Sequence, residues 1–105
     1  MTEVHQGEIF WLEKDALYIL VLSRQFFNQS GMAVVCPLME QASPDALHFE
    51  VVSEKYSGIA LLEQLRSLDL QARHFRRITR ISYDQIQDIS DAVQGIFDCY
   101  PFSID

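Results

Sequence analysis

The stretch ALYILVLSRQFFNQSGMAVVCPLM, residues 16–39, decides the fold of this chain. It contains two apolar runs, 16–23 and 32–39, separated by a segment with the turn-forming residues asparagine, serine and glycine. The nearly continuous apolar character of the first run is typical of a central strand that is buried on both faces. In the second run, Pro37 indicates a sheet edge or a bend. We therefore expect two neighbouring strands joined by a short loop.

The segments on either side continue this pattern of short strands. Residues 7–13 predict a preceding strand, which only the link Lys14–Asp15 joins to the next one. Residues 46–52 alternate between apolar and polar side chains, and residues 59–65 and 74–82 predict a fifth and a sixth strand. Many short strands predict a mostly β or α+β chain, in which a small curled sheet or barrel protects its own edges.

The C-terminal part of the chain predicts one helix. Ser82 followed by Gln85 matches a capping box, in which the hydroxyl accepts an amide hydrogen bond and the glutamine side chain reaches back. Apolar residues then recur at helical spacing and define one stripe, which consists of Ile86, Ile89, Val93, Ile96 and Phe97.

Length and composition narrow the class of protein. The 105 residues favour a single domain spanning residues 1–105, with the composition of an ordinary globular protein. No apolar run reaches the ~20 residues that a membrane helix needs, and the N-terminus does not resemble a secretory leader. Two cysteines, Cys36 and Cys99, are too few for a disulfide framework, so we expect reduced thiols in a cytoplasmic protein. Cys36, inside an apolar run, is expected to be a small buried residue.

No spacing of histidines and cysteines suits a metal ion, and we expect no metal site and no cofactor. His48 is expected to be a satisfied residue of the sheet. Trp11 and Tyr56 are aromatic residues that either stack on nucleobases or fill a core or a dimer interface.

Positive charge is concentrated in residues 66–80, although the formal net charge of the chain is −7. Five of its eight basic residues lie there: Arg66, Arg73, Arg76, Arg77 and Arg80. One interpretation is that they pair with some of the fifteen carboxylates. The other is that some of them line a groove for an anion, which is either RNA phosphate or the acidic tail of a protein. In an extended strand Arg76 and Arg80 would share a face and Arg77 would lie on the opposite one.

Several short fragments carry a resemblance to a known family. They are GEIFW at 7–11, VLS at 21–23, FNQSG at 27–31, VVCPL at 34–38 and EQLRSLD at 63–69. In order and spacing the chain resembles the PemK/MazF (Kid) toxins of bacterial type II toxin–antitoxin systems over about residues 7–97. The resemblance implies a small, strongly curved antiparallel β-barrel of the SH3-like or CcdB-like type with a C-terminal α-helix. It also implies a cytoplasmic homodimer and a cognate antitoxin with an acidic, disordered tail.

For most family members the resemblance further implies the activity of an mRNA interferase, a metal-independent endoribonuclease that cleaves single-stranded RNA. This chain departs from the ribonucleases in three places. The long loop that they carry between the first two strands is reduced here to about Lys14 and Asp15. Leu17 and Tyr18 stand where they carry an arginine–proline pair, and Leu38 and Met39 follow the proline where they carry a threonine or serine. Ser43 is the nearest hydroxyl, in the next loop.

RNA cleavage needs a base, an acid and a cation that stabilises the charge developing on phosphorus. Lys14 and Arg66 are the candidates for the cation, and Glu40 is a candidate for the base, with Glu13 as a substitute. The candidates for binding RNA or the antitoxin are Arg66, Arg73, Arg76 and Arg77. Two hypotheses therefore remain open besides a stand-alone structural relative. The chain is either an endoribonuclease toxin or a non-cleaving relative that binds an antitoxin, gyrase or another protein.

Overall fold

The computed structural model of the chain describes residues 3–99 and 101. Seven strands form one sheet: β1 (Glu8–Leu12), β2 (Leu17–Val21), β3 (Met32–Met39), β4 (His48–Val52), β5 (Ser57–Leu61), β6 (Arg66–Asp69) and β7 (Phe75–Arg80). The helices are a short α1 (Gln25–Asn28) and the long α2 (Tyr83–Ile96), and two 3₁₀ turns are η1 (Leu62–Gln64) and η2 (Leu70–Ala72).

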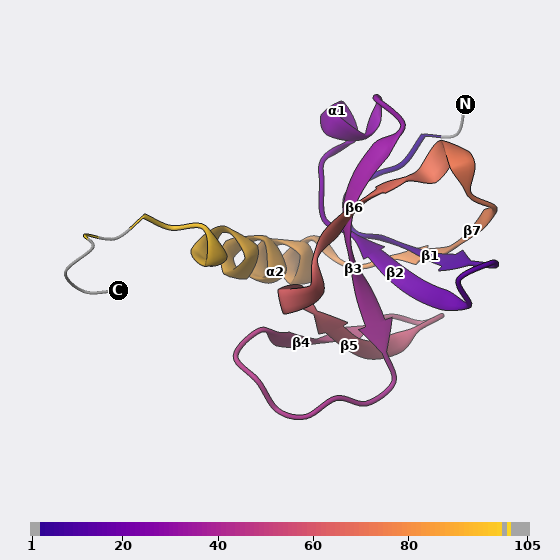
Figure 1. Ribbon diagram of the computed structural model, residues 1–105. Coiled ribbons are helices and arrows are strands. Elements are labelled where there is room, and N and C mark those ends of the chain that lie inside the picture. Colours follow the sequence, from indigo (N-terminus) through magenta and orange to yellow (C-terminus); the bar gives the residue numbers. More distant parts are fainter. Residues whose placement is uncertain (1–2, 100, 102–105) are drawn as a thin grey trace.

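All strand pairs are antiparallel, and the strand order is β4-β5-β3-β2-β1-β7. β3 is the longest strand and has two partners on one edge, because β6 pairs with its first half and β5 with its last residues. The sheet curls strongly, and α2 extends from it toward the C-terminus (Figure 1). Among the described residues the end strands β4 and β7 do not pair, so the sheet forms a half-barrel. The predicted fold, a curled antiparallel sheet with a C-terminal helix, is confirmed.

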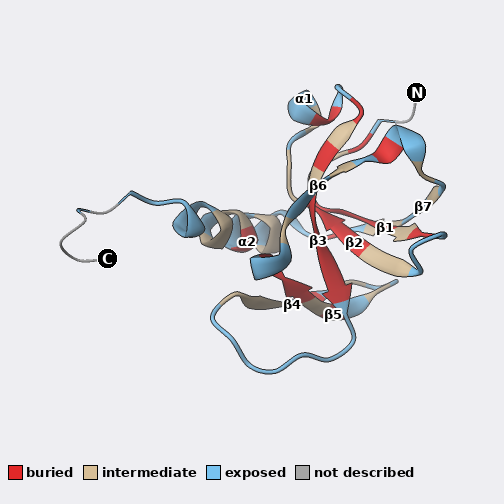
Figure 2. Ribbon diagram, in the orientation of Figure 1, coloured by how far each residue is buried: buried red, intermediate tan, exposed pale blue. Residues whose placement is uncertain are grey.

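Apolar side chains are buried on both faces of the sheet, which is why β2 is nearly continuous in apolar residues. On one face, Leu20 and Cys36 pack with Ile89 of α2. On the other face, Ile19 and Val35 pack with Leu70 of η2. The buried residues concentrate where β1, β2 and β3 lie side by side (Figure 2). The prediction that Cys36 is a small buried residue is confirmed, since it is fully buried.

The N-terminus of α2 is fixed by a cap and by contacts with the sheet. Ser82 accepts a hydrogen bond from the Gln85 amide at 3.3 Å, as the capping box predicts. The Gln85 side chain, however, also bonds both backbone groups of Val52, at 2.8 and 2.9 Å, and so joins α2 to β4. Gly7 has φ of +88°, and any β-carbon there would collide with Ile86. This close approach seats the first turns of α2 against β1.

The prediction of a single strand over residues 59–65 is wrong. β5 ends at Leu61, and the fully buried Leu62 begins the turn η1. The chain then returns as β6, which the sequence analysis did not predict. The segment 25–28, expected to be a turn, contains one helical turn, α1. In the described part of the chain, no helix combines the length and apolar character that crossing a membrane requires.

Candidate functional site

Two of the candidate arginines line one small hollow. Arg66 begins β6 and Arg73 follows η2, and both lie beside Asp15 of the β1–β2 turn. The hollow has a volume of about 80 Å³ and an apolar wall that includes Ile19 and Val35. We call it the arginine hollow, defined by Asp15, Arg66 and Arg73. Two guanidinium groups against one carboxylate leave it positively charged, which suits an anionic ligand.

Local structure explains why these arginines meet. Arg66 lies opposite Val35 in the β3–β6 register, which places it at the edge of the sheet. The turn η2 is held by the Asp69 side chain, which accepts a hydrogen bond from the Gln71 amide at 3.0 Å, and by the buried Leu70. This turn brings the chain back so that Arg73 faces the same hollow.

The arginines are bound unequally within the hollow. Arg73 donates from Nη1 to the Asp15 carboxylate at 2.7 Å, while its Nε is buried and has no hydrogen-bond partner among the described residues. Arg66 has only a long contact of 3.4 Å from Nε to the Gln64 carbonyl, and its charge is not neutralised by any described carboxylate. The buried Nε of Arg73 therefore lacks an acceptor beside the unpaired guanidinium of Arg66. An anion or a water molecule bound there would supply the missing hydrogen-bond acceptor.

The other three arginines of residues 66–80 lie on β7, away from the arginine hollow. Arg77 donates to Glu8, whose side chain is only 5% exposed, so it is the partner of a buried acid. Arg80 donates to the Gln6 carbonyl at 2.9 Å. Arg76 is exposed and lies opposite Trp11 in the β1–β7 register. A bulge in this register at Ile9/Phe10 interrupts the simple alternation expected for β7. The structure therefore does not gather all candidate arginines in one groove.

Glu40 lies in a second hollow, together with Met39 and three aromatic residues, Trp11, Tyr18 and Tyr56. We call it the aromatic hollow. It is open and has a volume of about 440 Å³. Lys14 is exposed in the β1–β2 turn and is not among the residues that line either hollow. The three catalytic candidates are thus distributed over three places.

The two hollows open on opposite faces of the sheet. In β3, Val35 and Pro37 line the arginine hollow, whereas Leu38 lines the aromatic hollow. Successive side chains of a strand point to opposite faces, so a ligand in one hollow does not reach the floor of the other. Leu17, at the start of β2, lines both hollows. Leu17 therefore lies where the two hollows meet.

His48 is held by two hydrogen bonds, as expected for a satisfied residue of the sheet. Its Nε2 lies 2.7 Å from the Glu63 carboxylate and its Nδ1 lies 2.5 Å from the Ser43 carbonyl. These bonds, with that to Glu63 the larger cause, raise the pKa of His48 above its ordinary value of 6.5. Burial raises the pKa of the Cys36 thiol to about 12, so this thiol is not a nucleophile at neutral pH.

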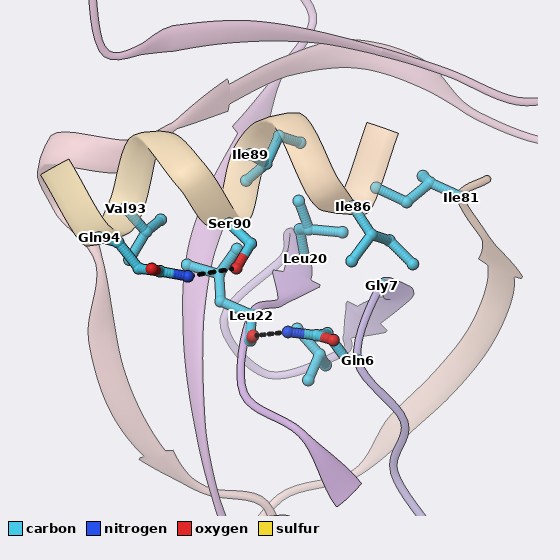
Figure 3. Close-up of a pocket in the computed structure, with 11 residues that line it drawn as sticks. Gln6, Gly7, Leu20, Leu22, Ile81, Ile86, Ile89, Ser90, Val93 and Gln94 are labelled. Atoms are coloured by element: carbon cyan, nitrogen blue, oxygen red, sulfur yellow. Dashed lines mark hydrogen bonds between the residues drawn. The ribbon is translucent and has the colours of Figure 1, made fainter. Parts of the chain in front are cut away.

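A third, smaller hollow lies between α2 and the sheet. Figure 3 shows Ile86 and Val93 of α2 on one side of it and Leu20 and Leu22 on the other. Its volume is about 60 Å³ and its walls are mainly apolar. The stripe of α2 continues past this hollow to residues that are exposed, Ile96 at 39% and Phe97 at 69%. This part of the helix surface suits packing against another protein surface.

Two residues that shape these sites are not among the predicted site residues. Asp15 is predicted only as part of a turn, although its carboxylate pairs with Arg73. Tyr18 is not predicted to belong to a site, although its ring contacts both Trp11 and Tyr56. The alternation of β2 could have indicated that Tyr18 shares a face with Leu20.

Solved structures place the fold in a known class. A crystal structure of MazE–MazF from Deinococcus radiodurans matches with a TM-score of 0.83 and 21% sequence identity, covering 92% of this chain and 98% of that one. An endoribonuclease from a mycobacterial species matches with a TM-score of 0.80 and 13% identity, covering 96% and 98%. The Mycobacterium tuberculosis toxin MazF-mt6 matches with a TM-score of 0.68 and 13% identity, covering 91% and 100%. The fold is thus that of MazF proteins.

A family model described as the PemK-like, MazF-like toxin of type II toxin–antitoxin systems matches residues 5–97. This chain belongs to that family. No curated protein sequence matches it.

Proposed function

We propose that this chain, as a single domain, is the toxin of a type II toxin–antitoxin system and that it cleaves single-stranded RNA. Its membership of the PemK-like, MazF-like toxin family over residues 5–97 is the observation that carries this proposal. A structural relative carries the name endoribonuclease, and the arginine hollow supplies the positive charge that a phosphate needs.

We further propose a homodimer and a cognate antitoxin as partners. The exposed apolar end of α2, at Ile96 and Phe97, supports a second subunit, because such a surface is stabilised when it is covered. The Deinococcus relative was crystallised with MazE and a mycobacterial endoribonuclease with its cognate antitoxin. An acidic tail would suit the arginine hollow as well as RNA phosphate does. Light scattering of the purified protein, with Phe97→Asp as the disrupting variant, tests the dimer.

RNA cleavage is tested by incubating the protein with a long RNA in EDTA and mapping the new 5′ ends. The protein is first unfolded and refolded, so that a co-purified antitoxin is removed. We expect cleavage at short sequences, and we expect Arg66→Ala to reduce it about tenfold or more, since an electrostatic contact to the developing charge is lost. Arg76→Ala, which removes an exposed arginine outside the arginine hollow, is the matched control. Absence of cleavage by the refolded, stable protein contradicts the ribonuclease proposal.

A specific observation favours a second candidate function, a binding protein that does not cleave RNA. Glu40 and Arg66 line hollows on opposite faces. By the sequence resemblance, Leu17 also stands where the ribonucleases carry arginine. A base and a cation that cannot reach the same phosphate do not form an active site. Under this alternative, co-expression with a short neighbouring reading frame yields a stable complex, while the free protein leaves RNA intact.

A further inference from the structure

The aromatic hollow is built around three rings in contact. The ring centroids of Trp11 and Tyr18 are 4.7 Å apart, and those of Tyr18 and Tyr56 are 4.8 Å apart. The strand register produces this arrangement, because Trp11 lies opposite Tyr18, which in turn lies opposite Leu38. Side chains at paired positions share one face of the sheet. A row of side chains therefore runs across β1, β2 and β3 toward β5.

The backbone at Gly58 makes room for the third ring. A β-carbon at this position would lie 2.5 Å from the Tyr56 hydroxyl and 2.8 Å from the Met39 carbonyl. The absence of a side chain lets Tyr56 lie against Tyr18. None of the three aromatic residues is fully buried, so each keeps part of its surface toward the open hollow.

The charge of this hollow differs from that of the arginine hollow. Glu40 is exposed at its rim and has no described lysine or arginine within ion-pair distance. No basic residue is among the described residues that line the hollow. Burial, then Tyr18 and then the Glu40 charge raise the pKa of Tyr56, which agrees with a carboxylate close to the rings. The lining of the hollow is therefore aromatic with one carboxylate, and the nearby Arg76, opposite Trp11 in the β1–β7 register, lies outside it.

We propose that the aromatic hollow binds the guanidinium group of an arginine carried by a partner protein. Aromatic faces attract a cation placed over them, and tryptophan does so most strongly. Glu40 supplies the opposite charge, and a planar guanidinium can stack on a ring while it donates two hydrogen bonds to a carboxylate. Met39, which is exposed and lines the hollow, adds a soft apolar wall for the arginine stem.

A nucleobase fits the same hollow less well. Rings stack on bases, but a nucleotide brings a phosphate, and the hollow offers that phosphate a carboxylate instead of a cation. The charge of the hollow thus selects a cationic partner, while the arginine hollow on the opposite face selects an anionic one.

Trp11 makes the proposal directly measurable, because it is the single tryptophan of the chain. We would titrate the full-length protein with Nα-acetyl-arginine amide and follow the tryptophan fluorescence. We expect a saturable change with the arginine amide, and a much weaker response to the uncharged, similarly polar Nα-acetyl-glutamine amide. Guanosine and adenosine monophosphate form the nucleotide arm of the experiment. No RNA is cleaved in this assay, so its outcome is independent of the proposed ribonuclease activity.

Variants separate the roles of the charge and the rings. Glu40→Gln is expected to weaken binding of the arginine amide about three- to fivefold, the range of an exposed ion pair. Tyr56→Leu is expected to weaken it further, whereas Tyr56→Phe, which keeps the ring, is expected to bind like the parent protein. Arg66→Gln, in the arginine hollow, is the control that leaves this binding unchanged. Thermal melting curves check that each variant is folded.

Three outcomes would overturn the proposal. The first is a response to the monophosphates with none to the arginine amide, which assigns the hollow to nucleobases. The second is equal binding of the arginine amide by the parent protein and by a folded Glu40→Gln variant. The third is a fluorescence change on dilution of the protein alone with no response to the arginine amide, which assigns the hollow to a second copy of the chain.

Discussion

Replacing Arg77 by alanine is expected to destabilise the protein, whereas the same replacement at the adjacent Arg76 is not. Glu8 is a nearly buried acid, with 5% of its side chain exposed. It accepts hydrogen bonds from Arg77 Nε and, at 2.6 Å, from the backbone amide of His5. Loss of the guanidinium leaves this carboxylate buried with no opposite charge. Arg76 is exposed and pairs with no described carboxylate, so its loss removes no such contact.

The burial of the two partners sets the expected magnitude. Breaking a fully buried ion pair costs about 3–5 kcal/mol, and exposed pairs contribute at most about 1 kcal/mol. Here the acid is buried while the Arg77 side chain is 53% exposed, so we expect an intermediate loss of about 2 kcal/mol. For a chain of about 100 residues this corresponds to a decrease in melting temperature of about 8 °C or more.

Urea and thermal unfolding followed by far-ultraviolet circular dichroism measure this difference. A second variant isolates the buried charge: Glu8→Gln in the Arg77→Ala background should recover part of the lost stability, because an amide is cheaper to bury than an unpaired carboxylate. Equal losses for the two arginine variants would refute the reasoning. So would a double variant that is less stable than Arg77→Ala alone.

Three further predictions concern the arginine hollow, the contact between β4 and η1, and the core. Asp15→Asn should increase the affinity for pyrophosphate up to about fivefold in calorimetric titrations, because Arg73 loses an exposed internal competitor. The pKa of His48 is raised in the folded state, so its pairing with Glu63 stabilises the folded protein fully below pH 6.5, and this stabilisation is lost as the pH rises through the folded pKa. The urea midpoint of the parent protein should therefore fall over that pH range, and the midpoint of His48→Gln should change less. Ile89→Ala should cost about 2–4 kcal/mol in urea unfolding, since Ile89 is 3% exposed on the face of α2 that packs against the sheet.

Much of the fold could be predicted because its signals are local. β3 occupies residues 32–39 as expected, since a continuous apolar run bounded by turn residues is a strand signal on its own. The start of α2 follows from Ser82 and the apolar spacing after it. β6 could not be recognised, because its four residues RSLD carry only one apolar side chain, Leu68. Its strand conformation comes from backbone pairing with β3, which no local pattern encodes.

The candidate site was less predictable because its decisive contacts join distant residues. Asp15 and Arg73 are 58 positions apart, and Glu8 and Arg77 are 69 apart. Which arginine meets an acid therefore depends on how β1 and β7 pair, including the bulge between them. Sequence spacing identified the residue types that bind anions. Only the strand register shows that Arg77 neutralises a buried acid, whereas the charge of Arg66 is not neutralised.

The sheet separates the basic arginine hollow on one face from the aromatic hollow with its carboxylate on the other, and this arrangement affects how a partner recognises the protein. An acidic chain with a formal charge of −7 gains little long-range attraction from a partner of similar charge, so short-range contacts must select the partner. A segment that crosses the start of β2, where Leu17 lines both hollows, can place an acid in the arginine hollow and an arginine in the aromatic hollow. A reversed segment would bring like charges together at both ends. Two hollows of opposite preference on either side of one strand therefore fix the direction of a bound chain, which neither hollow alone would do.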